Sequence, residues 1–163
     1  MNFSKLLDVK SPQRGTDFSA GIDFFIPEES DSFLEKLKQK NPEVSFCGSG
    51  FVIEPHNRIL IPSGIKVQIP DNTALIAFNK SGVATKLGLD VGASVIDSDY
   101  QGEIHISLTN PTSERVVLSF GQKIIQFLLL PIILTNPKEI PEKDLYDFKT
   151  QRSSGGFGST GSF

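Results

Sequence analysis

The sequence predicts an all-β fold, a sandwich or a barrel, for one domain. Short apolar runs recur along the chain, and turn residues such as Pro-Ser-Gly at 62–64 and Pro-Asp-Asn at 70–72 separate them. A length of 163 residues fits one domain that buries about two-thirds of its unfolded surface. The predicted strands are 6–9, 22–26, 51–53, 58–61, 65–69, 74–78, 104–108, 115–120 and 124–130.

One segment, near 31–41, has the pattern of a short helix. Ser32 and Glu35 have the spacing of a capping box, and Asn-Pro at 41–42 ends the pattern. The apolar face consists of Phe33, Leu34 and Leu37. A surface decoration is the plain interpretation of this helix, and a partner-binding or trimer-flanking element is the alternative.

Residues 94–106 read as a β-hairpin with a polar tip. Two apolar residues lead into the tip, and an alternating strand with Ile104, Ile106 and Leu108 on one side leads out. Asp97 stands at the end of the first strand, where partial desolvation makes a carboxylate a better base. Asp and Ser are also ordinary turn residues, so this pattern alone favours a capped turn.

The chain is predicted to end in a flexible arm, 151–163, that follows a domain of residues 1–150. Four Gly and four Ser among the last twelve residues cannot bury enough apolar surface to order this arm. The arm nevertheless carries a charge, an aromatic ring and hydroxyls, a set suited to closing over a nucleotide and excluding water. These residues are Arg152, Phe157, Ser159 and Thr160.

Composition excludes several classes of function. A net charge of −3 gives no general attraction to nucleic acid or to acidic membranes, so neither is expected as a partner. The single Cys47 cannot form an intrachain disulfide, and two histidines are too few for a zinc cluster, which suits the cytoplasm or another reducing compartment. The N-terminus, 1–8, meets a charge too early for the apolar core of a signal peptide, and the apolar run 124–134 is too short to span a bilayer.

Five short motifs follow one another along the chain: SAGID at 19–23, KSGVA at 80–84, VIDSDYQGE at 95–103, GQKIIQ at 121–126 and RSSGGFGSTG at 152–161. In this order they resemble the five signature motifs of the homotrimeric deoxyuridine triphosphatases (dUTPases). The resemblance implies a distorted jelly roll, the dUTPase-like β-clip, with the helix near 31–41 as an insertion. It also implies hydrolysis of dUTP to dUMP and pyrophosphate.

The resemblance gives the residues around Asp97 their roles. Asp97 would be the general base that activates a water for attack on the α-phosphorus. Tyr100 would lie against the deoxyribose and leave no room for a ribose 2′-hydroxyl. The uracil edge would be read by main-chain groups around Val91, Val95, Ile96 and His105. The imidazole of His105 is expected to be a packed or solvent-facing group rather than a catalyst.

The resemblance likewise implies the phosphate-binding residues. Lys80, Ser81 and Gly82 would offer a charge, a hydroxyl and backbone N–H groups, with Ser81 at the α,β-bridging oxygen. Gln122 would add a hydrogen bond, although an ordinary turn role is its alternative. From the arm, Arg152 would reach the γ-phosphate and Phe157 would stack over the base. Ser159 and Thr160 are the remaining phosphate contacts.

Mg²⁺ is the implied cofactor, bound mainly by phosphates and water, with Asp23 touching it through water. On its own pattern, Asp23 is a polar residue at a strand edge. In this family the motifs of one site come from three subunits, so the resemblance implies a homotrimer and an inactive isolated subunit.

Four positions depart from the family pattern. Asn79 and Lys80 stand where Pro-Arg is usual, and Lys lacks the bidentate guanidinium. Ser94 and Ser153 stand where Gly is usual. A positive φ at Ser94 would cost about 1 kcal/mol.

Two other functions remain open from the sequence. A dCTP deaminase shares this fold and would release ammonia from dCTP. A non-catalytic trimeric module that senses dUTP or binds a regulatory protein would bind dUTP without turnover.

Overall fold

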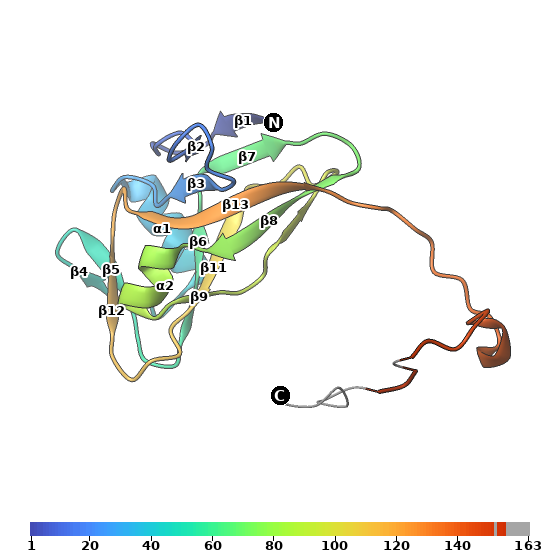
Figure 1. The fold of residues 1–163 in the computed structure, drawn as a ribbon. Coiled ribbons are helices and arrows are strands. Elements are labelled where there is room, and N and C mark those ends of the chain that lie inside the picture. Colours follow the sequence, from blue (N-terminus) through green and yellow to red (C-terminus); the bar gives the residue numbers. More distant parts are fainter. Residues whose placement is uncertain (152, 156–163) are drawn as a thin grey trace. The chain divides into compact units, whose positions relative to one another are not determined.

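Antiparallel strands are the main regular structure of the described residues (Figure 1). A computed structural model describes residues 1–151 and 153–155. Every strand pairing among these residues is antiparallel. The all-β prediction is therefore confirmed.

The strands of the described residues form four sheets. The largest has the order β10-β8-β13-β3-β2, which are Val95–Asp97, Thr73–Asn79, Lys123–Pro131, Ile22–Phe25 and Gln13–Arg14. The second has the order β6-β11-β9, which are Arg58–Pro62, His105–Thr109 and Asp90–Val91. The third has the order β12-β5-β4, which are Val116–Ser119, Gly50–Ile53 and Phe46–Cys47. The fourth pairs β1 (Asn2–Lys5) with β7 (Ile65–Gln68). Helices α1 (Asp31–Lys40) and α2 (Ser81–Leu87) each connect strands of different sheets.

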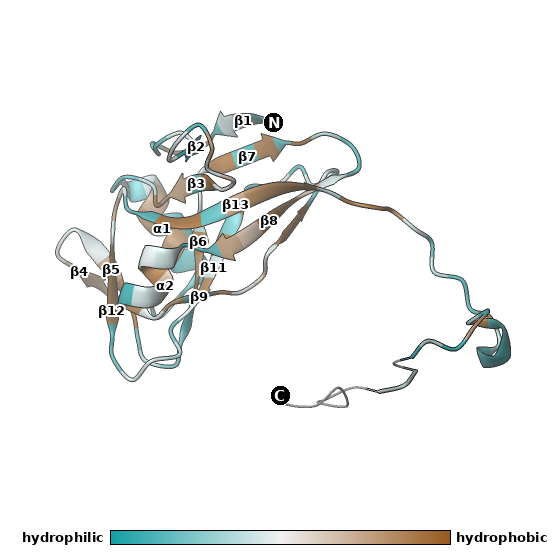
Figure 2. Ribbon diagram, in the orientation of Figure 1, coloured by the Kyte–Doolittle hydropathy of each residue, from teal (hydrophilic) through white to brown (hydrophobic). Residues whose placement is uncertain are grey.

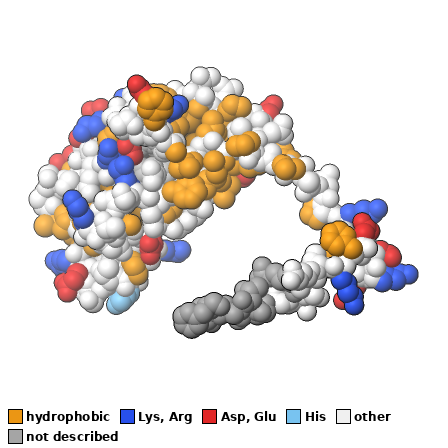
Figure 3. Space-filling view, in the orientation of Figure 1, with side chains coloured by type: hydrophobic (Ala, Val, Ile, Leu, Met, Phe, Trp, Pro, Cys, Tyr) orange, Lys and Arg blue, Asp and Glu red, His pale blue; other side chains and the backbone are white. Residues whose placement is uncertain are grey.

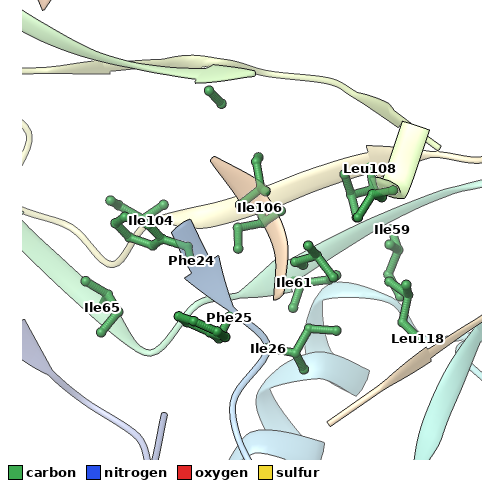
Figure 4. Packing of buried hydrophobic residues seen from close by; sticks show 14 of the residues in the cluster. Phe24, Phe25, Ile26, Ile59, Ile61, Ile65, Ile104, Ile106, Leu108 and Leu118 are labelled. Carbon is green, nitrogen blue, oxygen red and sulfur yellow. The ribbon is translucent and has the colours of Figure 1, made fainter. Parts of the chain in front are cut away.

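The core is built from alternating apolar residues of these strands. Ile106 and Leu108 of β11 are buried and lie directly opposite Ile61 and Ile59 of β6 (Figure 4). Ile104, just before β11, is also buried, as the alternation predicts. Figure 2 shows hydrophobic residues along β8 and β13 as well.

Helix α1 is part of this core and not merely a surface decoration. Phe33 and Leu37 are fully buried, and the Phe33 ring lies edge-on to Phe51 at 6.4 Å between centroids. The N-cap is Ser30, whose hydroxyl accepts a hydrogen bond from the Phe33 N–H, so the predicted capping box at Ser32 is wrong. The predicted helix is present but starts earlier. Its start is set by the serine whose hydroxyl reaches an N–H group of the first turn, and that serine is Ser30 rather than Ser32.

The predicted strand 6–9 is wrong, because the N-terminal strand is β1. Leu6 donates its N–H to the Gly64 carbonyl, and Val9 is buried outside any strand. A short apolar run predicts burial, but it does not distinguish a strand from an irregular segment that packs into the core.

The predicted hairpin at 94–106 is also wrong. β10 pairs with β8, whereas β11 pairs with β6 and β9 in another sheet. Alternation fixes which face of a strand is buried but not which strand is its neighbour. Residues 98–104 therefore cross from one sheet to another instead of forming a tight turn.

The chain divides into a compact unit, Met1–Ile133, and a second unit that begins at Leu134. The second unit contains a short 3₁₀ helix, Glu142–Asp144, so it begins before the predicted boundary at residue 150. Arg152 and residues 156–163 lie outside the described residues. The predicted roles of Arg152, Phe157, Ser159 and Thr160 therefore stay predictions.

No helix in the described part of the chain is long and apolar enough to cross a membrane. Cys47 is exposed and free.

Candidate active site

Asp97 lies at the last position of β10, opposite Ala74 at the start of β8. Its side chain is exposed, so its own chain does not supply the desolvation expected at this strand end. β10 is an edge strand of its sheet among the described residues, so some of its main-chain groups face away from β8. Val95, on the same strand, is 59% exposed. This edge is therefore open to solvent within the compact unit Met1–Ile133.

Tyr100 is held against its own loop. Its hydroxyl donates to the Glu103 carbonyl at 2.9 Å, and its ring lies where a Cβ on residue 102 would clash, which requires Gly102. His105 Nδ1 lies 2.9 Å from the same carbonyl. Because a carbonyl only accepts, Nδ1 carries a proton in this contact. His105 is thus a packed group, and Tyr100 presents a fixed, partly exposed ring.

The segment of Lys80, Ser81 and Gly82 joins β8 to α2. Lys80 is the N-cap with extended backbone, and Ser81 and Gly82 are exposed in the first turn. The first N–H groups of a helix have no intrahelical acceptor. A Cβ on Gly82 would meet no atom within 4 Å, so the space beside this turn is open. The loop can therefore offer N–H groups and a hydroxyl to an anion.

The ammonium of Lys80 lies against Asp23 in this structure. Lys80 Nζ is 2.8 Å from Asp23 Oδ1, and Lys123 Nζ is 3.0 Å from Asp23 Oδ2. Asp23 is buried on β3, which lies between β13 and β2, so it is not at the edge of the sheet. Burial raises the pKa of Asp23, but the two lysines outweigh it, so the pKa lies below its ordinary value.

These contacts leave Asp23 poorly suited to Mg²⁺. Both carboxylate oxygens already bind ammonium groups, which repel a divalent cation. The described residues contain no group of three His, Cys, Asp or Glu side chains that could hold a metal. The predicted contact of Asp23 with the metal through a water molecule stays a prediction.

Asp23→Asn is expected to lower the free energy of unfolding by about 2 kcal/mol near pH 7, because two partly exposed ammonium groups lose their counter-ion. Since the folded pKa lies below the ordinary value of 3.8, this stabilisation is present above that value and is lost as pH falls through the lowered pKa. Urea unfolding of both proteins across this pH range measures it. Asp99→Asn, at an exposed position, is the control. A stability difference that does not shrink in acid would contradict this assignment.

Asn79 and Gln126, for which the sequence indicated no role, form hydrogen bonds at the Asn79 end of β8. Asn79 Oδ1 accepts the Val91 N–H at 2.8 Å, which occupies one of the main-chain groups predicted to read uracil. Gln126 Nε2 donates to the Asn79 carbonyl at 2.9 Å. The Gln126 side chain lies where a Cβ on residue 21 would be, which explains Gly21 of the first motif. The only sequence signal for these roles is position: Asn79 lies next to the motif at 80–84, and Gln126 lies within the motif at 121–126.

Two other predicted positions take local roles. Gln122 Oε1 accepts the Ser119 N–H at 2.9 Å across the turn between β12 and β13. This contact is the ordinary turn role that was the alternative to a phosphate contact. Ser94 does not have a positive φ, so the strain considered there is absent. Ser153 does, at 47°, where the family usually has Gly.

The predicted site residues gather in two separate places. Asp97 is opposite Ala74, whereas Lys80 follows Asn79 at the other end of β8. Five residues of strand separate these ends by roughly 17 Å. The described residues of a single chain therefore do not bring the Asp97 carboxylate and the Lys80–Gly82 turn together.

The sheet face between these two places is apolar and exposed. Val95 lies opposite Ile76, which lies opposite Leu128. Phe78 and Leu130 on the same sheet are 43% and 36% exposed. Figure 3 shows hydrophobic side chains gathered over this part of the molecule. Such a patch is typical of a protein–protein interface.

Comparisons with known proteins place this all-β fold, with its exposed Asp97 carboxylate and its turn at Lys80–Gly82, in one family. The dUTPase family profile matches residues 48–161. A deoxyuridine 5′-triphosphate nucleotidohydrolase of Desulfitobacterium hafniense is 40% identical over 155 residues, covering 93% of this chain and 87% of that protein. One of Yarrowia lipolytica is 30% identical over 154 residues, covering 94% and 83%. The chain belongs to the dUTPase family.

Solved structures agree on the fold. The dUTPase of Staphylococcus bacteriophage 80alpha with dUPNHPP superposes with a TM-score of 0.71 at 22% identity, covering 98% of this chain and 97% of that one. A mutant dUTPase of phage phi11 of S. aureus, which coordinates a structural Mg(II) ion, gives 0.63 at 20% identity, covering 86% and 96%. The predicted dUTPase-like β-clip is confirmed.

Proposed function

We propose that this protein hydrolyses dUTP to dUMP and pyrophosphate. The proposal depends mainly on membership of the dUTPase family, and the exposed Asp97 carboxylate and the Tyr100 ring held by Glu103 support it. Asp97 accepts a proton as the water oxygen bonds to the α-phosphorus. The α,β-bridging P–O bond breaks, and pyrophosphate leaves with the electron pair. Ser81 and the first-turn N–H groups of α2 stabilise the charge that develops on the leaving oxygen.

Substrate selection rests on the edge of β10 and on the loop after it. The main-chain groups of Val95 and Ile96 that face away from β8 can pair with uracil. The Tyr100 ring, fixed by Gly102 and the Glu103 carbonyl, lies against the deoxyribose and excludes a 2′-hydroxyl.

The site is proposed to form between copies of the chain in a homotrimer. The separation along β8 supports this, because one copy's Asp97 end must meet another copy's Lys80–Gly82 loop to complete a site. The exposed apolar face between them is the proposed contact surface. Such a contact also desolvates Asp97. The arm, 151–163, is proposed to close over the site from a further copy.

Mg²⁺ is proposed to arrive with the triphosphate. Its direct ligands are proposed to be phosphate oxygens and water, and Asp23, whose oxygens bind Lys80 and Lys123, is proposed to touch it only through water. Magnesium neutralises phosphate charge when bound. The proposed compartment is the cytoplasm or another reducing one.

Product analysis tests the reaction. The purified protein with dUTP and Mg²⁺ is expected to release equal amounts of dUMP and pyrophosphate, and no ammonia from dCTP. Removal of the metal with EDTA should stop the release. Ammonia from dCTP would identify a deaminase, and tight dUTP binding without pyrophosphate would identify a sensor. Either result would overturn the proposal.

A further inference from the structure

Helix α1 is bonded to the loop that carries Tyr100. Lys36 Nζ, on the helix, lies 3.0 Å from Glu103 Oε2, and the Glu103 side chain is only 12% exposed. The other carboxylate oxygen, Oε1, accepts the Gly64 N–H at 2.8 Å. The carboxylate is thus bound from two sides, by the helix and by the turn between β6 and β7.

The main chain of the same residue holds the sugar-facing ring. The Glu103 carbonyl accepts the Tyr100 hydroxyl and binds His105 Nδ1, both at 2.9 Å. Any displacement of Glu103 therefore moves the acceptor that fixes the Tyr100 ring.

The helix is a rigid support for this contact. Phe33 and Leu37, on either side of Lys36 in sequence, are fully buried. At its C-terminal end, Asn41 Nδ2 donates to the Leu60 carbonyl at 2.9 Å, and Asn41 Oδ1 accepts the Leu60 N–H at 2.9 Å. Lys36 therefore projects from a backbone that is fixed at its core face and at its end.

We propose that Lys36 is a positioning residue for Tyr100. It holds Glu103, Glu103 holds the phenol, and the helix near 31–41 thereby sharpens the discrimination between deoxyribose and ribose nucleotides. The kinetic part of this inference rests on the proposed dUTP hydrolysis, but the positioning itself does not.

Tyrosine fluorescence tests the positioning without turnover. The chain has no Trp and two Tyr, and Tyr146 is 78% exposed in the second unit, so Tyr146→Phe leaves Tyr100 as the sole tyrosine. In this background, Lys36→Met is expected to lower the anisotropy of Tyr100 and to increase its quenching by acrylamide. Lys36→Arg should preserve both values. Lys40→Met, at an exposed position of the same helix, is the matched control and should change neither.

Kinetics with dUTP and UTP test the consequence. Lys36→Met is expected to lower the ratio of kcat/KM for dUTP over UTP by about fivefold, the effect of losing one partly buried ion pair. The kcat for dUTP should stay within about twofold, because Asp97 is untouched. Lys36→Arg should keep the wild-type ratio. In a Glu103→Gln background, Lys36→Met should cause no further loss of the ratio, because the ion pair is already absent.

The two readouts separate the possible failures. If the wild-type protein does not hydrolyse dUTP, the proposed function fails while the fluorescence still decides the positioning. If Lys36→Met matches Lys40→Met in both anisotropy and quenching, the positioning role is overturned whatever the activity. If fluorescence changes but the dUTP to UTP ratio does not, the claim that the helix sharpens sugar discrimination is overturned.

Discussion

Asp97→Asn is expected to lower kcat for dUTP by about 10²–10⁴-fold, the usual contribution of a positioned general base. The amide has nearly the same shape as the carboxylate but cannot accept the proton of the attacking water. The affinity for dUTP should change little, because the base, sugar and phosphates are bound by other groups. Steady-state kinetics measures the first effect, and calorimetric titration with a non-hydrolysable dUTP analogue measures the second.

Asp99→Asn is the matched control for this variant. Asp99 lies two residues away and is also exposed, but it does not end β10. Its replacement should leave kcat within about threefold of wild type, as for a surface residue outside the reaction. Equal damage from the two variants would show that the loop tolerates no change in charge, and it would remove the evidence for Asp97 as the base.

Mixed trimers are expected to regain activity from two inactive chains. One variant carries Asp97→Asn with an intact arm, and the other retains Asp97 but lacks residues 151–163. If the carboxylate and the arm of one site come from different copies, random mixing gives about a quarter of the sites an intact set. Each variant alone should have almost no activity.

Refolding a one-to-one mixture from urea, followed by a pyrophosphate assay, makes this measurement. Each variant refolded alone and then combined without unfolding is the control. If both parts of the site came from one chain, no mixture of these variants would contain an intact site. Activity that stays at background after refolding would therefore contradict a shared site.

The sequence could predict much of the fold because its strands bury alternate residues. Ile104, Ile106 and Leu108 alternate because they face the buried side of the sheet, where Ile59 and Ile61 lie opposite Leu108 and Ile106. The local sequence pattern is therefore enough to predict this strand and its buried face. Helix α1 was predictable from a different local pattern, because Phe33 and Leu37 recur at helical spacing and both are buried. The partner of β10 was not, since the same alternation fits pairing with β8 or with β11.

The site was predictable in its residue types but not in its contacts. The motifs indicate Asp97, Tyr100 and Ser81, yet nothing local shows that β8 separates the first two from the third. Lys80 binds Asp23, which lies 57 positions away in the sequence, and Lys36 binds Glu103, which lies 67 positions away. Such pairs depend on how the sheets meet, which a short motif does not record.

Hydrolysis in ¹⁸O-labelled water tests the central claim most directly. If a water activated by Asp97 attacks the α-phosphorus of dUTP, mass spectrometry will find one ¹⁸O atom in each dUMP and none in the pyrophosphate, and Asp97→Asn will slow the formation of the labelled dUMP. Label in the pyrophosphate instead would place the attack on the β-phosphorus and contradict the account.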